Sequence, residues 1–396
     1  MSSVAGLQSS EPQGLNVDNA RTIASVVGGS GVALLALFLA PVLVGEYIAQ
    51  LGVSEASAGL ILSMELTGFT VGSAALFLFA RTSWRKLVFV ALMIMIAANL
   101  ALLLVTNLPL FVLCRFTAGL GSGMVMTMTI QVIGLMRDPD RVYGLWTVGQ
   151  LALGALGMVL FPTVIAIGGV NTVFLIWALL AATLLLSVRF YPRGRNTVPA
   201  PGAHGESRGH ARVGLLALVG LFIYYSGQAG VWVYMERIGI SWEIEPAVIA
   251  QLLFVSLLAA IAGAMVAIVI GDKFGRAIPL SVSMTISAFS ITLLMSLEGV
   301  MLFVVAACLF NFGWYLFLPF ISAIISTTDN DGRLLTGLAV TFPASLAADP
   351  AIAALLIGHG ESLLPCLIYG AASVPLGLAL ILPATGAANK FKESLL

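Results

Sequence analysis

Charged side chains are scarce in this chain of 396 residues: 9% are Asp, Glu, Lys or Arg, whereas 60% are hydrophobic. A soluble domain of this length needs more polar surface, so the composition excludes a soluble fold. Cysteine and histidine are also rare, with three of each. Cys114, Cys308 and Cys366 lie in apolar stretches. Their odd number argues against a disulfide framework, and nothing beside them suggests metal ligands, so we expect neither a metal nor a cofactor.

Twelve apolar runs, separated by short polar gaps, make up most of the chain. A bilayer core about 30 Å thick requires about 20 apolar residues per helix, and the runs meet that length. Transmembrane strands are excluded because they are shorter and alternate in polarity. We therefore predict an all-α membrane protein with transmembrane helices over 24–47, 57–80, 87–106, 110–136, 143–166, 171–190, 213–235, 247–270, 278–297, 300–325, 334–357 and 363–384.

Lysine and arginine indicate which side of the membrane each gap occupies. With the N-terminus in the cytoplasm, all but two of the 18 basic residues fall on the cytoplasmic side or in the cytoplasmic tails. Of those two, Arg237 lies outside and Arg115 lies within a span. The positive-inside rule therefore predicts cytoplasmic termini, in agreement with the even number of spans. We expect an integral protein of a bacterial inner membrane.

A polar stretch of Pro, Gly and basic residues at 191–212 divides the spans into two sets of six. This composition predicts a flexible cytoplasmic linker. Two six-helix halves joined in this way indicate a transporter whose binding site lies between them. The predicted organisation is a disordered N-terminus (1–23), a first six-helix bundle (24–190), the linker (191–212), a second six-helix bundle (213–384) and a cytoplasmic tail (385–396).

Basic residues mark two equivalent cytoplasmic loops. The loop between the eighth and ninth spans reads GDKFGR over 271–276, whereas the loop between the second and third keeps the basic residues but lacks the glycines and the acid. The first of these resembles the cytoplasmic loop motif of the major facilitator superfamily. The resemblance implies a gating role, by charge and helix-dipole contacts, for Gly271, Asp272, Gly275, Arg276, Arg81 and Arg85.

Two further stretches carry the same resemblance. Arg115 is followed by Gly119 and Gly123 at four-residue spacing, which looks like the superfamily's fourth-helix motif and predicts close helix packing. Residues 41–59 look like the first outer loop of arabinose-efflux-like and drug–proton antiporter permeases. The fifth-helix antiporter motif is only half present over 149–157, because no proline stands beside the glycines. The resemblance implies two six-helix bundles and transport by alternating access.

Two carboxylates lie well inside spans, Glu65 and Asp349, and both are candidates for proton coupling together with Arg115. Ionisable groups inside a membrane are costly unless paired or hydrated, so they are functional candidates by default. We hypothesise that Glu65 pairs with Arg115 in one state and exchanges the pair for a proton in another. Alternatively the pair is a permanent packing element, and Asp349 satisfies an amide freed near Pro350.

Aromatic and amide side chains cluster on the spans that line the cavity in the superfamily. Rings with a few amides and hydroxyls suit a neutral or amphipathic organic molecule. Packing or an interfacial aromatic belt is the alternative, particularly for Trp232. The candidate substrate-binding residues are Tyr224, Gln228 and Trp232 on the seventh span, Asn311, Trp314 and Tyr315 on the tenth, and Thr127 and Gln131 on the fourth.

Together these features predict a secondary active transporter that exports a small organic solute by proton coupling, with facilitative or importing activity as alternatives. Its expected partners are the solute, the proton and the lipid bilayer; we expect a monomer that binds no nucleic acid. An intramembrane serine hydrolase is a remote alternative, since residues 28–31 read GGSG but no span contains a histidine to act as base. A channel is disfavoured because no repeated filter sequence appears.

Overall fold

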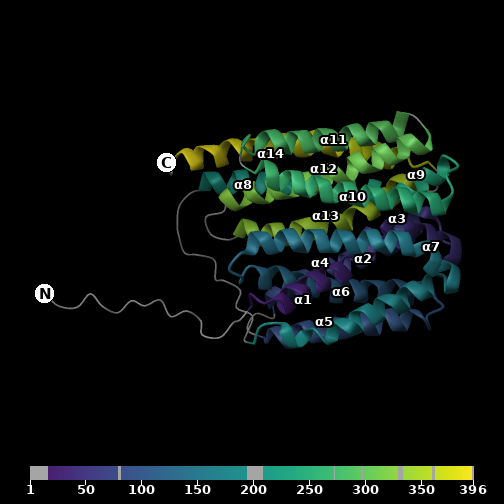
Figure 1. Cartoon of the computed structure of the whole chain (residues 1–396). Helices are drawn as coiled ribbons and strands as arrows, with labels where there is room; N and C mark the ends of the chain where they lie inside the picture. Colours follow the sequence, from purple (N-terminus) through teal and green to yellow (C-terminus); the bar gives the residue numbers. More distant parts are fainter. Residues whose placement is uncertain are drawn as a thin grey trace.

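The computed structural model describes residues 17–78, 82–193, 208–271, 273–296, 298–328, 333–358 and 362–394. These ranges are almost entirely helical, and Figure 1 shows the helices lying side by side in two stacked groups. The first group comprises α1 (Ala20–Ala33), α2 (Leu35–Phe38), α3 (Ala40–Leu51), α4 (Glu55–Leu78), α5 (Trp84–Leu102), α6 (Leu108–Ile133), α7 (Pro139–Leu185) and the 3-10 helix η1 (Val188–Phe190). The second comprises α8 (Arg208–Val233), α9 (Met235–Ser241), α10 (Pro246–Ile270), α11 (Ala277–Ser296), α12 (Val300–Thr328), α13 (Arg333–Ile357) and α14 (Leu364–Ser394).

Ten helices of the described ranges are long and apolar enough to cross a membrane, compared with the twelve spans expected. The first expected span is broken into α1, α2 and α3, with non-helical junctions at Leu34 and Leu39. The fifth and sixth are joined in α7, whose 47 residues correspond to about 70 Å of helix, more than twice a bilayer core. Gly168 and Gly169 interrupt α7, and Gly169 has a φ of 66°. The chain turns back there.

Asparagine and aspartate in the polar gaps cap the helices that follow them. The side chain of Asn19 accepts a hydrogen bond from the amide of Thr22 at 2.8 Å, and that of Asn107 accepts from Leu110 at 2.9 Å. Asp138 caps α7 in the same way. Each cap satisfies an amide that the first helical turn leaves without a partner.

Glycines allow α4 and α6 to cross with their backbones in contact. A Cβ at Gly119 or Gly123 would overlap the carbonyl groups of Glu65 and Phe69 on α4. The relation is reciprocal, because Gly68 on α4 faces the backbone of α6 in the same way. The spacing of these glycines thus brings Glu65 and Arg115, one on each helix, within reach of each other.

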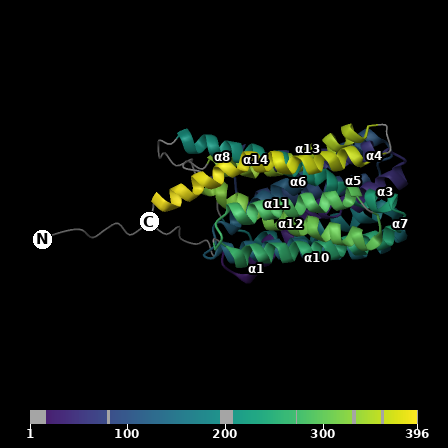
Figure 2. The ribbon, with the colours of Figure 1, turned by 90° about the horizontal axis from the view of Figure 1, so that it is seen from above.

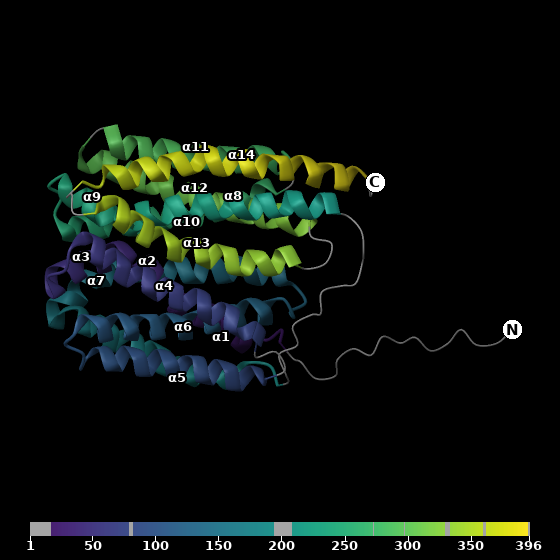
Figure 3. The same ribbon diagram turned by 180° about the vertical axis from the view of Figure 1, so that it is seen from behind.

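The two groups of helices are called here the first and second halves. They meet chiefly where α4 packs on α13 and α7 packs on α10, and α3 also packs on α8 and α9. A hydrogen bond from Ser63 Oγ to the carbonyl of Ala347, at 2.6 Å, joins α4 to α13. Figure 3 shows α13 lying between the bulk of the second half and α4. The interface between the halves is therefore formed by helices that run the length of the molecule.

The two ends of the bundle differ in what they contain. Figures 1 and 2 show α3 and the turn of α7 at one end, and the last turns of α14 with the start of α8 at the other. The distribution of basic residues predicts that the second of these ends is cytoplasmic. We call the end with α3, α9 and the Gly168–Gly169 turn the outer end.

Candidate functional site

Glu65 and Arg115 form an ion pair inside the first half. Arg115 Nη2 donates a hydrogen bond to Glu65 Oε2. Arg115 has no exposed surface and Glu65 is 5% exposed, so the pair is shielded from solvent and from lipid. A buried charge is tolerated only when paired, and each group supplies the other's partner.

Side chains from three other helices complete the surroundings of Arg115. Its Nη1 donates to Asn99 Oδ1 on α5 at 3.4 Å. Its guanidinium lies over the rings of Phe174 and Trp177 on α7, at 5.1 and 4.9 Å from their centroids. The buried hydroxyl of Tyr47 on α3 also lies beside it. Cation–π contacts and a neutral amide thus stabilise the cation without adding a second negative charge.

None of these four surrounding residues was identified from the sequence. Asn99 carried a usable signal, because an amide inside an apolar run requires a hydrogen-bond partner. Phe174, Trp177 and Tyr47 carried none, since aromatic residues are common in such runs and only the packing of α3, α7 and α6 brings these three to Arg115.

Asp349 lies apart from that pair, in the second half. It is fully buried on α13, and its Oδ2 accepts a hydrogen bond from the amide of Gly230 on α8. Its Oδ1 has no hydrogen-bond partner within the described part of the chain. The amide that it accepts from is on a neighbouring helix rather than near Pro350, so the carboxyl links α13 to α8. Its role in coupling stays a prediction.

Four of the predicted substrate-binding residues line one small cavity between the halves. The cavity is about 10 Å³, room for about one water molecule, so a solute enters only if the halves move. It is lined by Trp232, Asn311, Trp314 and Tyr315 together with Leu37, Phe38 and Leu257.

A proline makes one contact across this cavity possible. Pro41 has no amide hydrogen, so the carbonyl of Leu37, four residues earlier, lacks its usual helical partner. Trp232 Nε1 donates to that carbonyl at 2.8 Å. The break in the first expected span therefore provides the acceptor that ties α2 to α8, one half to the other.

The other predicted substrate-binding residues lie away from this cavity. Tyr224 shares a hydrogen bond of 2.9 Å with Ser287 on α11. Gln228 Nε2 donates to the carbonyl of Gly370 on α14 at 3.1 Å, while its Oε1 has no partner in the described structure. Thr127 and Gln131 are half-buried on α6 towards the inner end. Their roles are not tested by this arrangement.

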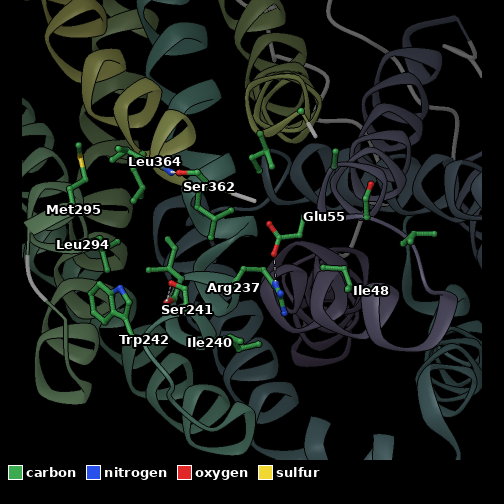
Figure 4. Close-up of a pocket in the computed structure, with 18 residues that line it drawn as sticks. Ile48, Glu55, Arg237, Ile240, Ser241, Trp242, Leu294, Met295, Ser362 and Leu364 are labelled. Carbon is green, nitrogen blue, oxygen red and sulfur yellow. Dashed lines mark hydrogen bonds and ion pairs between the residues drawn. The ribbon is translucent and has the colours of Figure 1, made fainter. Parts of the chain in front are cut away.

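Residues from both halves close the outer end. Arg237 Nε on α9 donates to Glu55 Oε1 on α4 at 2.8 Å, and Tyr234 Oη donates to the Glu55 carbonyl at 3.1 Å. Figure 4 shows the ion pair at the edge of an outer cavity of about 1140 Å³, with Trp242 and Met295 on its far wall. The sequence identified Arg237 as the outer basic residue, but not its partner.

The inner loops make backbone contacts. Gly271 and Gly275 have φ values of 49° and 66°, which glycine adopts without strain. Arg276 Nη1 donates to the carbonyl of Ala323 on α12 at 2.7 Å. Arg85 Nε donates to the carbonyl of Tyr191 at 2.9 Å, so it holds the segment that leads into the linker. Asp272 and Arg81, two of the predicted gating residues, lie outside the described residues.

The three cysteines are free thiols. Within the ranges that the structure describes, no group of three His, Cys, Asp or Glu residues is arranged to hold a metal ion.

Comparison with known proteins agrees with this architecture. A sequence profile described as Major Facilitator Superfamily matches residues 24–218, just under half of the chain. A mutant of the peptide transporter POT is similar in structure, with a TM-score of 0.74 and 13% identity over 92% of this chain and 95% of that one. A mutant of the nucleoside transporter NupG has a TM-score of 0.72 and 12% identity over 92% and 99%.

A human protein has the same fold. The organic anion transporter MFSD10 (TETRAN) has a TM-score of 0.65 and 15% identity, over 91% of this chain and 99% of that one. No curated protein sequence matches the chain. At these identities the likeness establishes the fold alone. The profile match thus covers the first half of the chain, and the structural likeness extends the same fold over both halves.

Proposed function

We propose that this chain is a secondary active transporter of the major facilitator superfamily that exports a small organic solute in exchange for protons. The observation that carries the proposal is the small aromatic cavity between the halves, beneath an outer end that residues of both halves close. A transporter that works by alternating access needs a central site whose two entrances open in turn. Here the outer entrance is closed.

Glu65 is our candidate proton carrier. When the carboxyl is charged it pairs with Arg115; when it binds a proton, Arg115 loses its anionic partner and retains Asn99 and the rings of Phe174 and Trp177. Breaking a buried pair costs about 3–5 kcal/mol when nothing replaces the lost partner. The aromatic and amide contacts reduce that cost, which makes both protonation states accessible.

The position of Glu65 connects this change to the halves. Ser63, two residues earlier on α4, donates to α13 across the interface. A shift of α4 relative to α6 on loss of the ion pair therefore alters the surface on which the second half packs. Helix α4 thus connects the Glu65–Arg115 ion pair, which lies within the first half, to the movement of the two halves relative to each other.

The cavity suggests what is transported. Two tryptophans, a tyrosine and an amide line it, and none of the lining residues that the structure describes is charged. Aromatic rings with sparse hydrogen bonding suit a neutral or amphipathic organic molecule that contains a ring. Peptides and nucleosides, which relatives of this fold carry, combine rings with amides and hydroxyls and belong in the substrate panel beside sugars and aromatic amphiphiles.

Proton flux in reconstituted vesicles tests the proposal. We expect an imposed proton gradient to drive transport of at least one member of the panel by the wild type. Glu65→Gln should still exchange that solute but no longer couple it to protons, because the amide keeps the shape and loses the titrating group. Glu298→Gln, which changes an exposed acid at the outer end, serves as the control. Equal coupling in Glu65→Gln would make the pair structural and Asp349 the next candidate; transport without proton movement would leave a facilitator.

A further inference from the structure

A second buried acid, Glu236, lies at the outer end between the halves. It belongs to the first turn of α9 in the second half and is 6% exposed. Its carboxyl group lies against the backbone of Gly45 on α3, in the first half, where any side chain at position 45 would occupy the same space. Its Oε2 has no hydrogen-bond partner in the described structure.

The charged groups around Glu236 do not neutralise it. Arg237, the next residue on α9, is engaged with Glu55 of α4. On α3, the charge that acts on Glu236 is that of another acid, Glu46. Helices α8, α10 and α12 also pack against α9. The sequences of α10 and α12 contain no charged residue, and the basic residues of α8 all stand in its first five positions, at the opposite end of that helix from α9. An ionised Glu236 would thus be a buried anion beside a second anion.

This environment shifts the acid–base equilibrium of Glu236, which lies beyond the membrane-spanning part of α8 (Arg212–Val233). Burial raises the pKa of Glu236 from 4.5 to about 8. The charge of Arg237 and a hydrogen bond with the backbone of Gly45 oppose the rise, and the charge of Glu46 adds to it. The closed outer end therefore holds the carboxyl in its neutral form at neutral pH.

We propose that Glu236 is a proton-binding site that latches the outer gate: the neutral carboxyl fits between α9 and Gly45, and its ionisation separates α9 from α3. The proposal rests on the transport function proposed above, since a latch has a role only where the outer end opens. It assigns to the outer end a proton site distinct from Glu65, which is enclosed within the first half.

The direction of the pH effect follows from the two protonation states. In the open state the carboxyl is hydrated and has an ordinary pKa near 4.5, whereas in the closed state the pKa is about 8. Closure is therefore fully favoured below the lower value and is lost as the pH rises to the higher one. One proton released on opening changes the open-to-closed ratio by at most about tenfold per pH unit. A proton arriving from outside closes the gate and returns the emptied carrier to its inward-facing state, as export requires.

Distance measurements between spin labels test the latch. Ser54 and Ser241 are exposed at the outer end on opposite halves and both line the outer cavity. With the three native cysteines replaced, labels on Ser54→Cys and Ser241→Cys report the opening of the gate between pH 5 and pH 9 in substrate-free protein. We expect the long-distance population to rise with pH in the otherwise wild-type protein, and to stay low at every pH in Glu236→Gln. The proposal would be overturned if Glu236→Gln showed the same pH dependence of the distances as the otherwise wild-type protein. It would also be overturned if the otherwise wild-type protein showed no pH dependence.

A second variant keeps the test informative if Glu236→Gln is poorly folded. Gly45→Ala places a methyl group where the carboxyl lies, so it should favour the open gate even at pH 5. Glu298→Gln, at an exposed outer acid, should behave as the wild type. A closed gate at low pH in Gly45→Ala would contradict the latch. Because no substrate is present, a titrating gate in a protein that shows no proton-coupled transport would refute the proposed function and leave the latch standing.

Discussion

Arg115 shows how a single side chain can be held in the interior of a membrane protein. An isolated arginine at the bilayer centre costs several kcal/mol, and here one acid, one amide and two rings share that cost. Of these four partners of Arg115, only Glu65 can change its charge. The chemistry of this site therefore depends on one carboxyl, and the surrounding residues determine how readily it gives up its partner.

Substitution of Asn311 tests whether the cavity between the halves binds the solute. Its Nδ2 donates to Ser256 Oγ on α10 at 3.1 Å, and the residue lines the space between the halves. We expect Asn311→Ala to weaken solute binding by about tenfold, the effect of losing about one hydrogen bond, with normal yield of folded protein. Equilibrium binding of a transported solute to purified protein measures this.

Gln228→Ala is the matched comparison for Asn311→Ala. Gln228 is also a buried amide, but it donates to the backbone of α14 away from the cavity. Its replacement should lower the thermal midpoint more than the affinity. Unchanged affinity in Asn311→Ala across the whole substrate panel would place Asn311 among the packing residues instead.

How far the site could be predicted depends on how rare each residue type is in its surroundings. Glu65, Arg115 and Asp349 stood out because charges in apolar runs are unusual, and the pairing of the first two followed from the helix neighbours that the family resemblance implied. Glu236 was not identified from the sequence, because it stands just beyond the seventh predicted span. An acidic residue at such a position is normally expected to lie in a loop and to be exposed to solvent. Only the packing of α9 on α3 buries Glu236.

At the scale of the helices, the close crossing of α4 and α6 is what brings Glu65 and Arg115 together. We expect Gly119→Ala to destabilise the protein, because the new Cβ would meet the Glu65 carbonyl, a backbone group that cannot move aside on its own. In an open helix position the same change stabilises by about 0.5–1 kcal/mol. Gly144, on α7, supplies that control as Gly144→Ala, because the nearest atom lies 4.0 Å from the position that its Cβ would take. Thermal unfolding of both variants in detergent gives the comparison; equal midpoints would show that α4 and α6 are not in close contact.

The helices were predicted better than their interruptions. Apolar length indicates a span because a bilayer imposes it, and most of the predicted spans correspond to single helices. The break near Leu39 has a cause in Pro41, whereas the junction at Leu34 has no proline or glycine of its own and depends on packing. The turn in α7 falls at the two glycines of a predicted polar gap, although the helix on either side continues up to it.

At the scale of the whole molecule, the two halves meet in one closed arrangement at the outer end. Trp232 bonds to Leu37, Arg237 pairs with Glu55, and Glu236 lies against Gly45, each contact joining one half to the other. The pair of Arg237 and Glu55 is partly exposed and contributes little by itself. Under the proposed mechanism these contacts form the outer gate, and all of them must separate when it opens.

Covalent closure of that gate tests the central claim most directly. In protein without its native cysteines, Glu55→Cys and Arg237→Cys place one thiol on each half, on either side of the present ion pair. A bifunctional maleimide with a cleavable disulfide in its spacer bridges the length of the two side chains that are removed. If solute crosses by alternating access, this cross-link should reduce transport to the level of empty vesicles, and a reductant that cleaves the spacer should restore it. Either single cysteine variant should be unaffected by the cross-linker. Transport that continues at the reduced protein's rate after complete cross-linking would contradict the account.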